Sequence, residues 1–155
     1  YKKKQKEDKG KLEVLLAKIS EKEQAIAKPK EVNLKIKDLE VERIITKLEQ
    51  LENKKYFLRI DCTVSNLAKK IKTNTTYLSK IINSYYQKTF TVYINDLRIE
   101  FVIDRLKNDK LFRRYSIKSI ANEIGFKSSE SFNSAFKKRT GVLPSTLIRA
   151  LENKN

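Results

Sequence analysis

The feature of this 155-residue sequence that most constrains its fold is an internal repeat. Four apolar or small positions recur at an offset of 53 residues: Val64, Leu67, Ala68 and Ile71 match Ile117, Ile120, Ala121 and Ile124. A second apolar pair follows each copy after a short turn, Leu78 and Ile82 in the first and Phe132 and Phe136 in the second. Because each set has helical spacing, the repeat predicts two helix-turn-helix units.

A small residue recurs at the same place in both copies. Two helices that cross at a steep angle approach closely, and Ala68 or Ala121 leaves room there for the facing Leu78 or Phe132. An ordinary helical bundle also shows apolar residues at this spacing. The prediction therefore rests on the duplication and not on either unit alone.

Capping residues indicate where the helices begin and end. In the first unit, about 63–86, Thr63 opens a helix to Ile71, and Asn74 or Thr75 opens a second helix to Tyr85. In the second unit, about 116–140, the expected signals are Ser116 before Ile117–Ile124, Gly125 after that helix, Ser128 or Ser129 before a helix to Thr140, and Pro144 at the start of a last helix.

Two further helices are predicted around these units. The stripe Val41, Ile44, Ile45, Leu48 and Leu51 predicts a core-facing helix from Asp38 to about Lys54. Thr91 is expected to cap a linker helix over about 91–107 that buries Ile94, Leu97, Phe101 and Leu106 and is followed by a polar, basic connection over 108–115. With only three Gly and two Pro residues in the chain, the fold class is predicted to be all-α: two helix-turn-helix subdomains joined by a long linker helix.

The net charge points to a polyanionic partner. It is +16, of which +11 lies after residue 55. Nucleic acid is the first candidate, an anionic membrane surface the second, and a merely Lys-rich surface the third. The chain has no His and one Cys, so metal, disulfide and catalytic readings are disfavoured, and Cys62 is expected to be a small buried residue. No cofactor is expected, and we do not expect an enzyme.

A series of residues in the second unit resembles the signature of the AraC/XylS family of transcription regulators: Ile117, Ile120, Ala121, Gly125, Phe126, Phe132, Phe136, Lys137, Gly141 and Pro144. The resemblance covers about Asp61 to Leu147 and includes, upstream, Leu67, Ala68, Tyr77, Leu78, Phe90, Tyr93, Ile94, Leu97 and Arg98. Ser128 stands where the family often has an acidic residue, and Ser131 where it often has an aromatic one.

The resemblance implies a sequence-specific DNA-binding transcription regulator that reads a two-part site in adjacent major grooves. The base-reading positions that it implies are Thr76, Ser79 and Lys80 in the first unit and Ser129, Glu130, Asn133 and Ser134 in the second. The nearby basic residues Lys118, Lys137, Lys138 and Arg139 are expected to contact phosphates. The alternative is a basic helical adaptor at an anionic membrane that reads no DNA sequence.

Residues 1–37 are expected to form a charged N-terminal linker ahead of a DNA-binding domain over 38–155. A thin stripe at Leu12, Leu15, Leu16, Ile19 and Ile26 leaves two readings open, a solvated helix or a homodimerisation element, with Lys22 and Pro29 against the second. Tyr1 and the lysines at 2–4 fit either the flank of an upstream membrane helix, as in a subgroup of the family with a helical-repeat sensor, or an ordinary basic linker. No apolar run approaches the roughly 20 residues of a membrane span, so we expect a soluble, cytoplasmic segment.

Overall fold

The computed structural model describes residues 12–16 and 31–154. Within these ranges the regular structure is helical and contains no strand, which confirms the all-α prediction. The elements are α2 (Glu31–Asn53), the 3-10 turn η1 (Tyr56–Leu58), α3 (Val64–Ile71), α4 (Thr75–Tyr86), α5 (Phe90–Asn108), the 3-10 turn η2 (Phe112–Arg114), α6 (Ile117–Glu123), α7 (Ser129–Thr140) and α8 (Pro144–Asn153).

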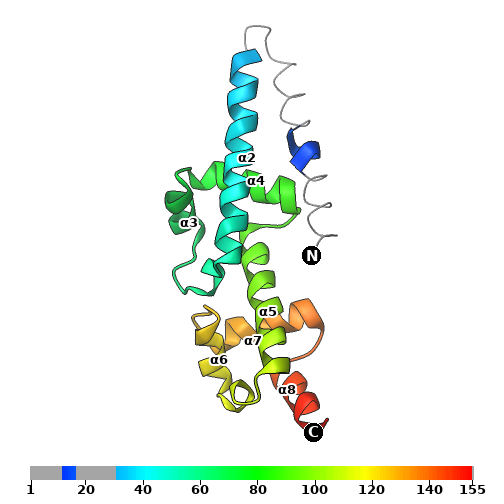
Figure 1. The fold of residues 1–155 in the computed structure, drawn as a ribbon. Coiled ribbons are helices and arrows are strands. Elements are labelled where there is room, and N and C mark those ends of the chain that lie inside the picture. The colour runs from blue at the N-terminus through cyan, green and yellow to red at the C-terminus, as the bar shows by residue number, and fades with distance from the viewer. Residues whose placement is uncertain (1–11, 17–30, 155) are drawn as a thin grey trace.

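The helices form two subdomains that share α5 (Figure 1). The first subdomain contains α2, α3 and α4, and the second contains α6, α7 and α8. Each has its own apolar core, and α5 supplies residues to both: Tyr93 and Ile94 to the first, and Ile99, Val102 and Leu106 to the second. Each unit thus buries its apolar face partly against a helix that it shares with the other unit.

The linker helix differs from its prediction in two respects. It begins at Phe90, because the side chain of Thr89, and not that of Thr91, accepts a hydrogen bond from the amide of Val92 at 3.2 Å. Leu97 and Phe101 are only half-buried. Ile94 and Leu106 are buried as predicted. The stripe is incomplete because α5 also buries residues outside it, such as Ile99 and Val102, against the second core.

The other caps confirm their predictions. Thr63, Asn74, Ser116 and Ser128 each accept a hydrogen bond from the amide three residues later, which satisfies a donor that the first turn of a helix leaves without a partner. Gly125 follows α6 and Gly141 ends α7, both with positive φ. The two helix pairs therefore lie where local capping chemistry placed them.

The segment between α5 and α6 is not the purely polar connection that we expected. Phe112 in η2 is 1% exposed and belongs to the second core, and the guanidinium of Arg105 lies 3.8 Å from the centre of its ring. Arg113 is also buried, and its Nη1 donates to the carbonyl oxygen of Leu106 at 2.9 Å. One aromatic ring among many basic residues gives no periodic signal, which is why the sequence pattern missed it.

At the N-terminal end, residues 12–16 form a helical turn that packs on the first core, with Leu15 only 4% exposed. These residues therefore pack against the first subdomain, whereas the sequence favoured a solvated linker. The domain's first helix begins at Glu31 rather than at Asp38. The rest of the proposed dimerisation stripe, from Ile19 to Ile26, and the basic residues at 2–4 lie outside the described residues. No helix in the described ranges is long and apolar enough to cross a bilayer.

Candidate nucleic-acid interface

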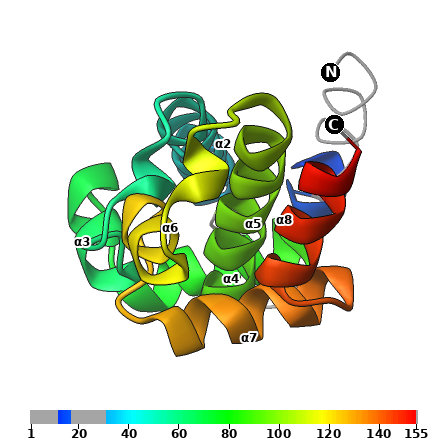
Figure 2. The same cartoon turned by 90° about the horizontal axis from the view of Figure 1, so that it is seen from below.

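The second helix of each helix-turn-helix unit is α4 in the first and α7 in the second. Both pack against α5. Seen from the end of the molecule, α4 and α7 lie on the same side of α5, whereas α3 and α6 lie together at another side (Figure 2). The repeat in the sequence thus becomes a repeat in space, with the two candidate reading helices on one face.

In α4 the apolar residues and the predicted base-reading residues lie on opposite sides of the helix. The buried side chains are Leu78, Ile81, Ile82 and Tyr85. Thr76, Ser79 and Lys80 are all exposed, and among the described residues no hydrogen bond or ion pair engages their side chains. The face that would enter a groove is therefore polar, short and accessible.

In α7 the division is less complete. Phe132 and Phe136 are fully buried, and their rings stack edge to face with centroids 5.9 Å apart. Glu130 and Ser134 are exposed, whereas Ser129 and Asn133 are half-buried. All four predicted base-reading residues of the second unit lie on this helix, and two of them are less exposed than the predicted base-reading residues of α4.

The predicted phosphate-binding residues fall into two groups. Lys118 on α6 and Lys137 and Lys138 on α7 are exposed. Arg139 is also exposed in part, but its Nη2 lies 2.9 Å from Glu100 Oε1 and its Nε lies 3.9 Å from Asp96 Oδ1, both on α5. The guanidinium of Arg139 is therefore engaged within the protein, in contrast to the three lysines.

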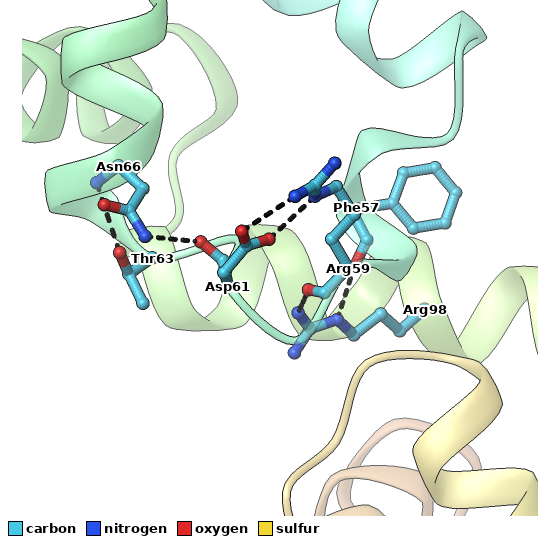
Figure 3. A network of polar contacts seen from close by, with 6 residues as sticks. All are labelled: Phe57, Arg59, Asp61, Thr63, Asn66 and Arg98. Carbon is cyan, nitrogen blue, oxygen red and sulfur yellow. Dashed lines mark hydrogen bonds and ion pairs between the residues drawn. The ribbon is translucent and has the colours of Figure 1, made fainter.

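A polar network fixes the segment that leads into α3 (Figure 3). Arg59 donates two hydrogen bonds to the carboxylate of Asp61, at 2.8 and 2.9 Å, and these bonds lower the pKa of Asp61. Asn66 donates its side-chain NH₂ to the backbone oxygen of Asp61 at 2.9 Å. The amide of Asn66 in turn donates to Thr63 Oγ1 at 3.1 Å. The first turn of α3 is thereby held to the loop that precedes it.

Arg98 of α5 joins this segment to the second unit (Figure 3). Its Nε donates to the carbonyl oxygen of Phe57 at 2.7 Å and its Nη2 to that of Arg59 at 2.9 Å. The guanidinium also lies 5.3 Å from the ring centre of Phe126, which follows the glycine of the second unit's turn. Burial lowers the pKa of Arg98, but the two carbonyl acceptors and the ring face favour the charged form.

Two features of this region were missed by sequence reasoning. Arg98 was noted only as part of the family resemblance, and Asp96 was not noted at all. Asp96 and Glu100 are four residues apart and so lie on one face of α5, which the sequence does show. Their cationic partner Arg139 is 39 residues from Glu100, and no local pattern predicts that contact.

Other kinds of site find no support in the described residues. Cys62 is buried in the first core, as expected, and burial raises the pKa of its thiol to about 11, which disfavours the nucleophilic thiolate. Within residues 12–16 and 31–154, no group of three His, Cys, Asp or Glu side chains is placed to hold a metal ion.

Comparisons with known proteins agree with this geometry. A family described as "Helix-turn-helix domain" matches residues 67–150, more than half of the chain. The chain is 33% identical over 90 residues to the Msm operon regulatory protein of Streptococcus mutans, and 30% identical over 84 residues to the raffinose operon transcriptional regulatory protein RafR of Pediococcus pentosaceus. These alignments cover 58% and 54% of this chain but only 31% and 29% of the relatives, so the chain spans about a third of their length.

A solved structure gives the same result. The C-terminal domain of AraT, a response regulator from Geobacillus stearothermophilus, is 26% identical and superposes with a TM-score of 0.60, covering 69% of this chain and 84% of that domain. The matched residues include most of the first helix-turn-helix unit, the helix α5 and the whole second unit. The chain therefore belongs to the AraC-type helix-turn-helix family of DNA-binding domains.

Proposed function

We propose that this chain regulates transcription by binding a two-part site in double-stranded DNA, with α4 and α7 in successive segments of the major groove. The observation that carries the proposal is that both helices present polar faces on the same side of α5 (Figure 2). Two reading helices can meet one face of B-DNA when about one helical turn, roughly 34 Å, separates the groove segments. One polypeptide can then read an asymmetric site without a partner.

The side chains suggest how each groove would be read. Lys80 can reach guanine, Asn133 can pair with N6 and N7 of adenine, and Glu130 can accept from N4 of cytosine. The hydroxyl groups of Thr76, Ser79, Ser129 and Ser134 discriminate less between bases. Lys118, Lys137 and Lys138 would neutralise phosphates, so we expect a steep dependence of affinity on salt. The ion pairs of Arg139 favour a structural role for that residue over a phosphate contact.

The cellular location of the chain and its assembly with other parts or copies are also part of this proposal. Binding to chromosomal DNA would place the chain in the cytoplasm, and its role as a reader of DNA is not enzymatic. A membrane tether upstream of residue 1 and a homodimer formed through the N-terminal region stay predictions, because they depend on residues that are mostly outside the described ranges.

A selection experiment tests the proposal. The immobilised 155-residue chain would select duplexes from a random-sequence DNA pool, and fluorescence titrations would compare the recovered duplex with a scrambled one at several salt concentrations. We expect the recovered duplex to bind at least about 1,000-fold more tightly. Lys138→Ala should weaken binding to both duplexes and reduce the salt slope by about one unit. Lys47→Ala, which removes an exposed lysine from α2, is the matched control and should change neither.

The same titrations separate the alternative function. Equal affinity for recovered and scrambled duplexes, together with tight binding to phosphatidylserine vesicles, would support a basic adaptor at a membrane and contradict specific DNA reading.

A further inference from the structure

A row of ion pairs crosses one face of the linker helix α5. Lys88 Nζ lies 2.8 Å from Asp96 Oδ2, and Arg139 Nε lies 3.9 Å from Asp96 Oδ1. One turn further along α5, Arg139 Nη2 lies 2.9 Å from Glu100 Oε1. A single carboxylate, that of Asp96, is therefore shared between a cation of the first subdomain and a cation of the second.

The two cations lie near the C-terminal ends of the two candidate reading helices. Lys88 follows the C-terminal end of α4 by two residues, and Arg139 is the last residue but one of α7. Asp96 thus pairs with a cation in the loop that joins α4 to α5 and with a cation in the last turn of α7. The side chain of Asp96 is only 15% exposed, so solvent and salt screen its interactions less than those of a fully exposed pair.

On the other side of α5, Arg98 attaches the helix to the loop before α3 and to the turn of the second unit. An α-helix advances by about 100° per residue, so Asp96 and Arg98 point in nearly opposite directions. Arg98 contacts the segment before α3 and the ring of Phe126, whereas Asp96 pairs with the loop after α4 and with the last turn of α7. The linker helix therefore makes polar contacts with parts of both subdomains on two of its sides.

We propose that Asp96 is a positioning residue that sets the placement of α4 relative to α7 and, through it, the spacing between the two DNA elements that the chain accepts. The second part of this inference rests on the proposed function. Partly exposed ion pairs contribute little to the free energy of unfolding. We therefore expect Asp96 to affect the relative placement of α4 and α7 more than the stability of the fold. This placement matters because each reading helix must meet its own segment of the groove.

The placement itself can be tested without DNA. Spin labels on cysteines introduced at Ser84 of α4 and Lys138 of α7, both exposed, would report the distance between the two helices by pulsed electron resonance. Cys62 is buried and should not react with the label. We expect Asp96→Asn to shift or broaden the distance distribution of the parent chain. An unchanged distribution would overturn the proposal.

Asp104→Asn is the matched control. It makes the same change of charge on the same helix, but Asp104 Oδ1 accepts a local hydrogen bond from Asn108 at 3.1 Å, and within the described residues no ion pair joins Asp104 to α4 or α7. Its distance distribution should match that of the parent. If Asp96→Asn lost its helical circular dichroism, Lys88→Gln would test the same attachment from a side chain that lies outside the core.

The consequence for DNA is tested with a series of duplexes. The selected duplex would be altered by inserting or deleting one or two base pairs between its two elements, each of which changes their separation by about 3.4 Å and rotates one element about the DNA axis. The parent and Asp104→Asn should lose about tenfold or more in affinity per inserted base pair, whereas Asp96→Asn should lose several-fold less. An equal loss in Asp96→Asn and Asp104→Asn would contradict the assignment of spacing to Asp96.

The two experiments fail in distinguishable ways. A parent chain that prefers no two-part duplex would contradict the proposed function and the DNA part of this inference together. The distance measurement would still decide whether Asp96 positions the helices.

Discussion

The two helix-turn-helix units make the same turn with different residues. Lys72 and Gly125 are 53 residues apart and so occupy the same place in the repeat, and their φ angles are 65° and 95°. The backbone hydrogen bond that closes the turn is also repeated: Thr73 N to Ala68 O and Phe126 N to Ala121 O are both 2.9 Å. The backbone conformation is shared, yet only the second unit uses glycine.

The surroundings of the two turns explain the difference. Lys72 is exposed, so its side chain extends into solvent and the left-handed conformation costs it only local strain. A Cβ on Gly125 would lie 2.8 Å from the carbonyl oxygen of Leu58 and 2.9 Å from the guanidinium of Arg98. Glycine is needed where the turn also meets another part of the chain closely. The first unit therefore has a free turn, whereas the second unit's turn is part of the contact between the subdomains.

The largest expected effect compares the cores of the units. Leu78 and Phe132 occupy matching positions and are both fully buried. We expect Phe132→Ala to lower the free energy of unfolding by about 3–5 kcal/mol and Leu78→Ala by about 2–5 kcal/mol, because each leaves a cavity. Denaturant titration measures both, and DNA binding should fall with stability. A Phe132→Ala variant that unfolds like the parent but no longer binds DNA would show that this ring is not a core residue.

The turns are the next comparison. Gly125→Ala should destabilise the chain by about 2–4 kcal/mol, since it combines left-handed strain with a collision against a backbone carbonyl that cannot rotate away. Lys72→Gly should stay within about 1 kcal/mol of the parent, because relief of strain is offset by the greater freedom of glycine in the unfolded chain. Thermal unfolding of both variants provides the measurement. Similar losses in the two variants would contradict the distinction between a free turn and a contact turn.

A substitution in one reading helix should affect only the DNA element that this helix reads. Lys80→Ala should cost about 1–3 kcal/mol of binding free energy and relax base preference only in the element read by α4. Asn133→Ala should do the same only in the element read by α7. Titrations against duplexes with one element scrambled at a time distinguish the two. Loss of preference in both elements from one substitution would mean that the units do not read independently.

What the sequence predicted and what it missed follow a physical division. The caps Thr63, Ser116 and Ser128 were predicted because a cap depends on residues within one turn of it. The buried face of α5 was predicted only in part, at Ile94 and Leu106, because α5 contributes residues to two separate cores. The cap of α5 was assigned to Thr91 instead of Thr89 because both are threonines near the start of the same helix.

In the candidate site, too, the features that depend on local sequence were predicted and those that depend on long-range packing were not. The exposure of Thr76, Ser79 and Lys80 follows from the apolar period of α4, which the sequence shows directly. The attachment of Arg139 to α5 does not, because it joins residues far apart in the chain and depends on how the subdomains pack. Contacts of any of these residues with DNA stay predictions.

The smallest expected effect concerns the helix before the free turn. Arg43 of α2 donates to the carbonyl oxygens of Ile71 and Lys72, at 2.6 and 3.2 Å, and so caps the C-terminal end of α3. Glu40 accepts from Arg43 Nε at 3.2 Å, and this hydrogen bond lowers the pKa of Glu40 below its ordinary value of 4.5. A carboxyl with a lowered folded-state pKa stabilises the fold above its unfolded pKa, and the stabilisation is lost as the pH falls through the folded value.

Glu40→Gln should therefore destabilise the chain near neutral pH, and the difference from the parent should disappear as the pH falls through the lowered folded-state pKa of Glu40. Because the side chain of Glu40 is 41% exposed, screening should keep the loss below about 1 kcal/mol. Glu42→Gln, an exposed change on the same helix, is the control. Hydrogen exchange of the Thr73 amide, compared with that of the matching Phe126 amide, shows where the loss acts: protection should fall in the first turn and stay unchanged in the second. An equal fall at both amides would mean that Glu40 stabilises the chain as a whole and not the turn that Arg43 caps.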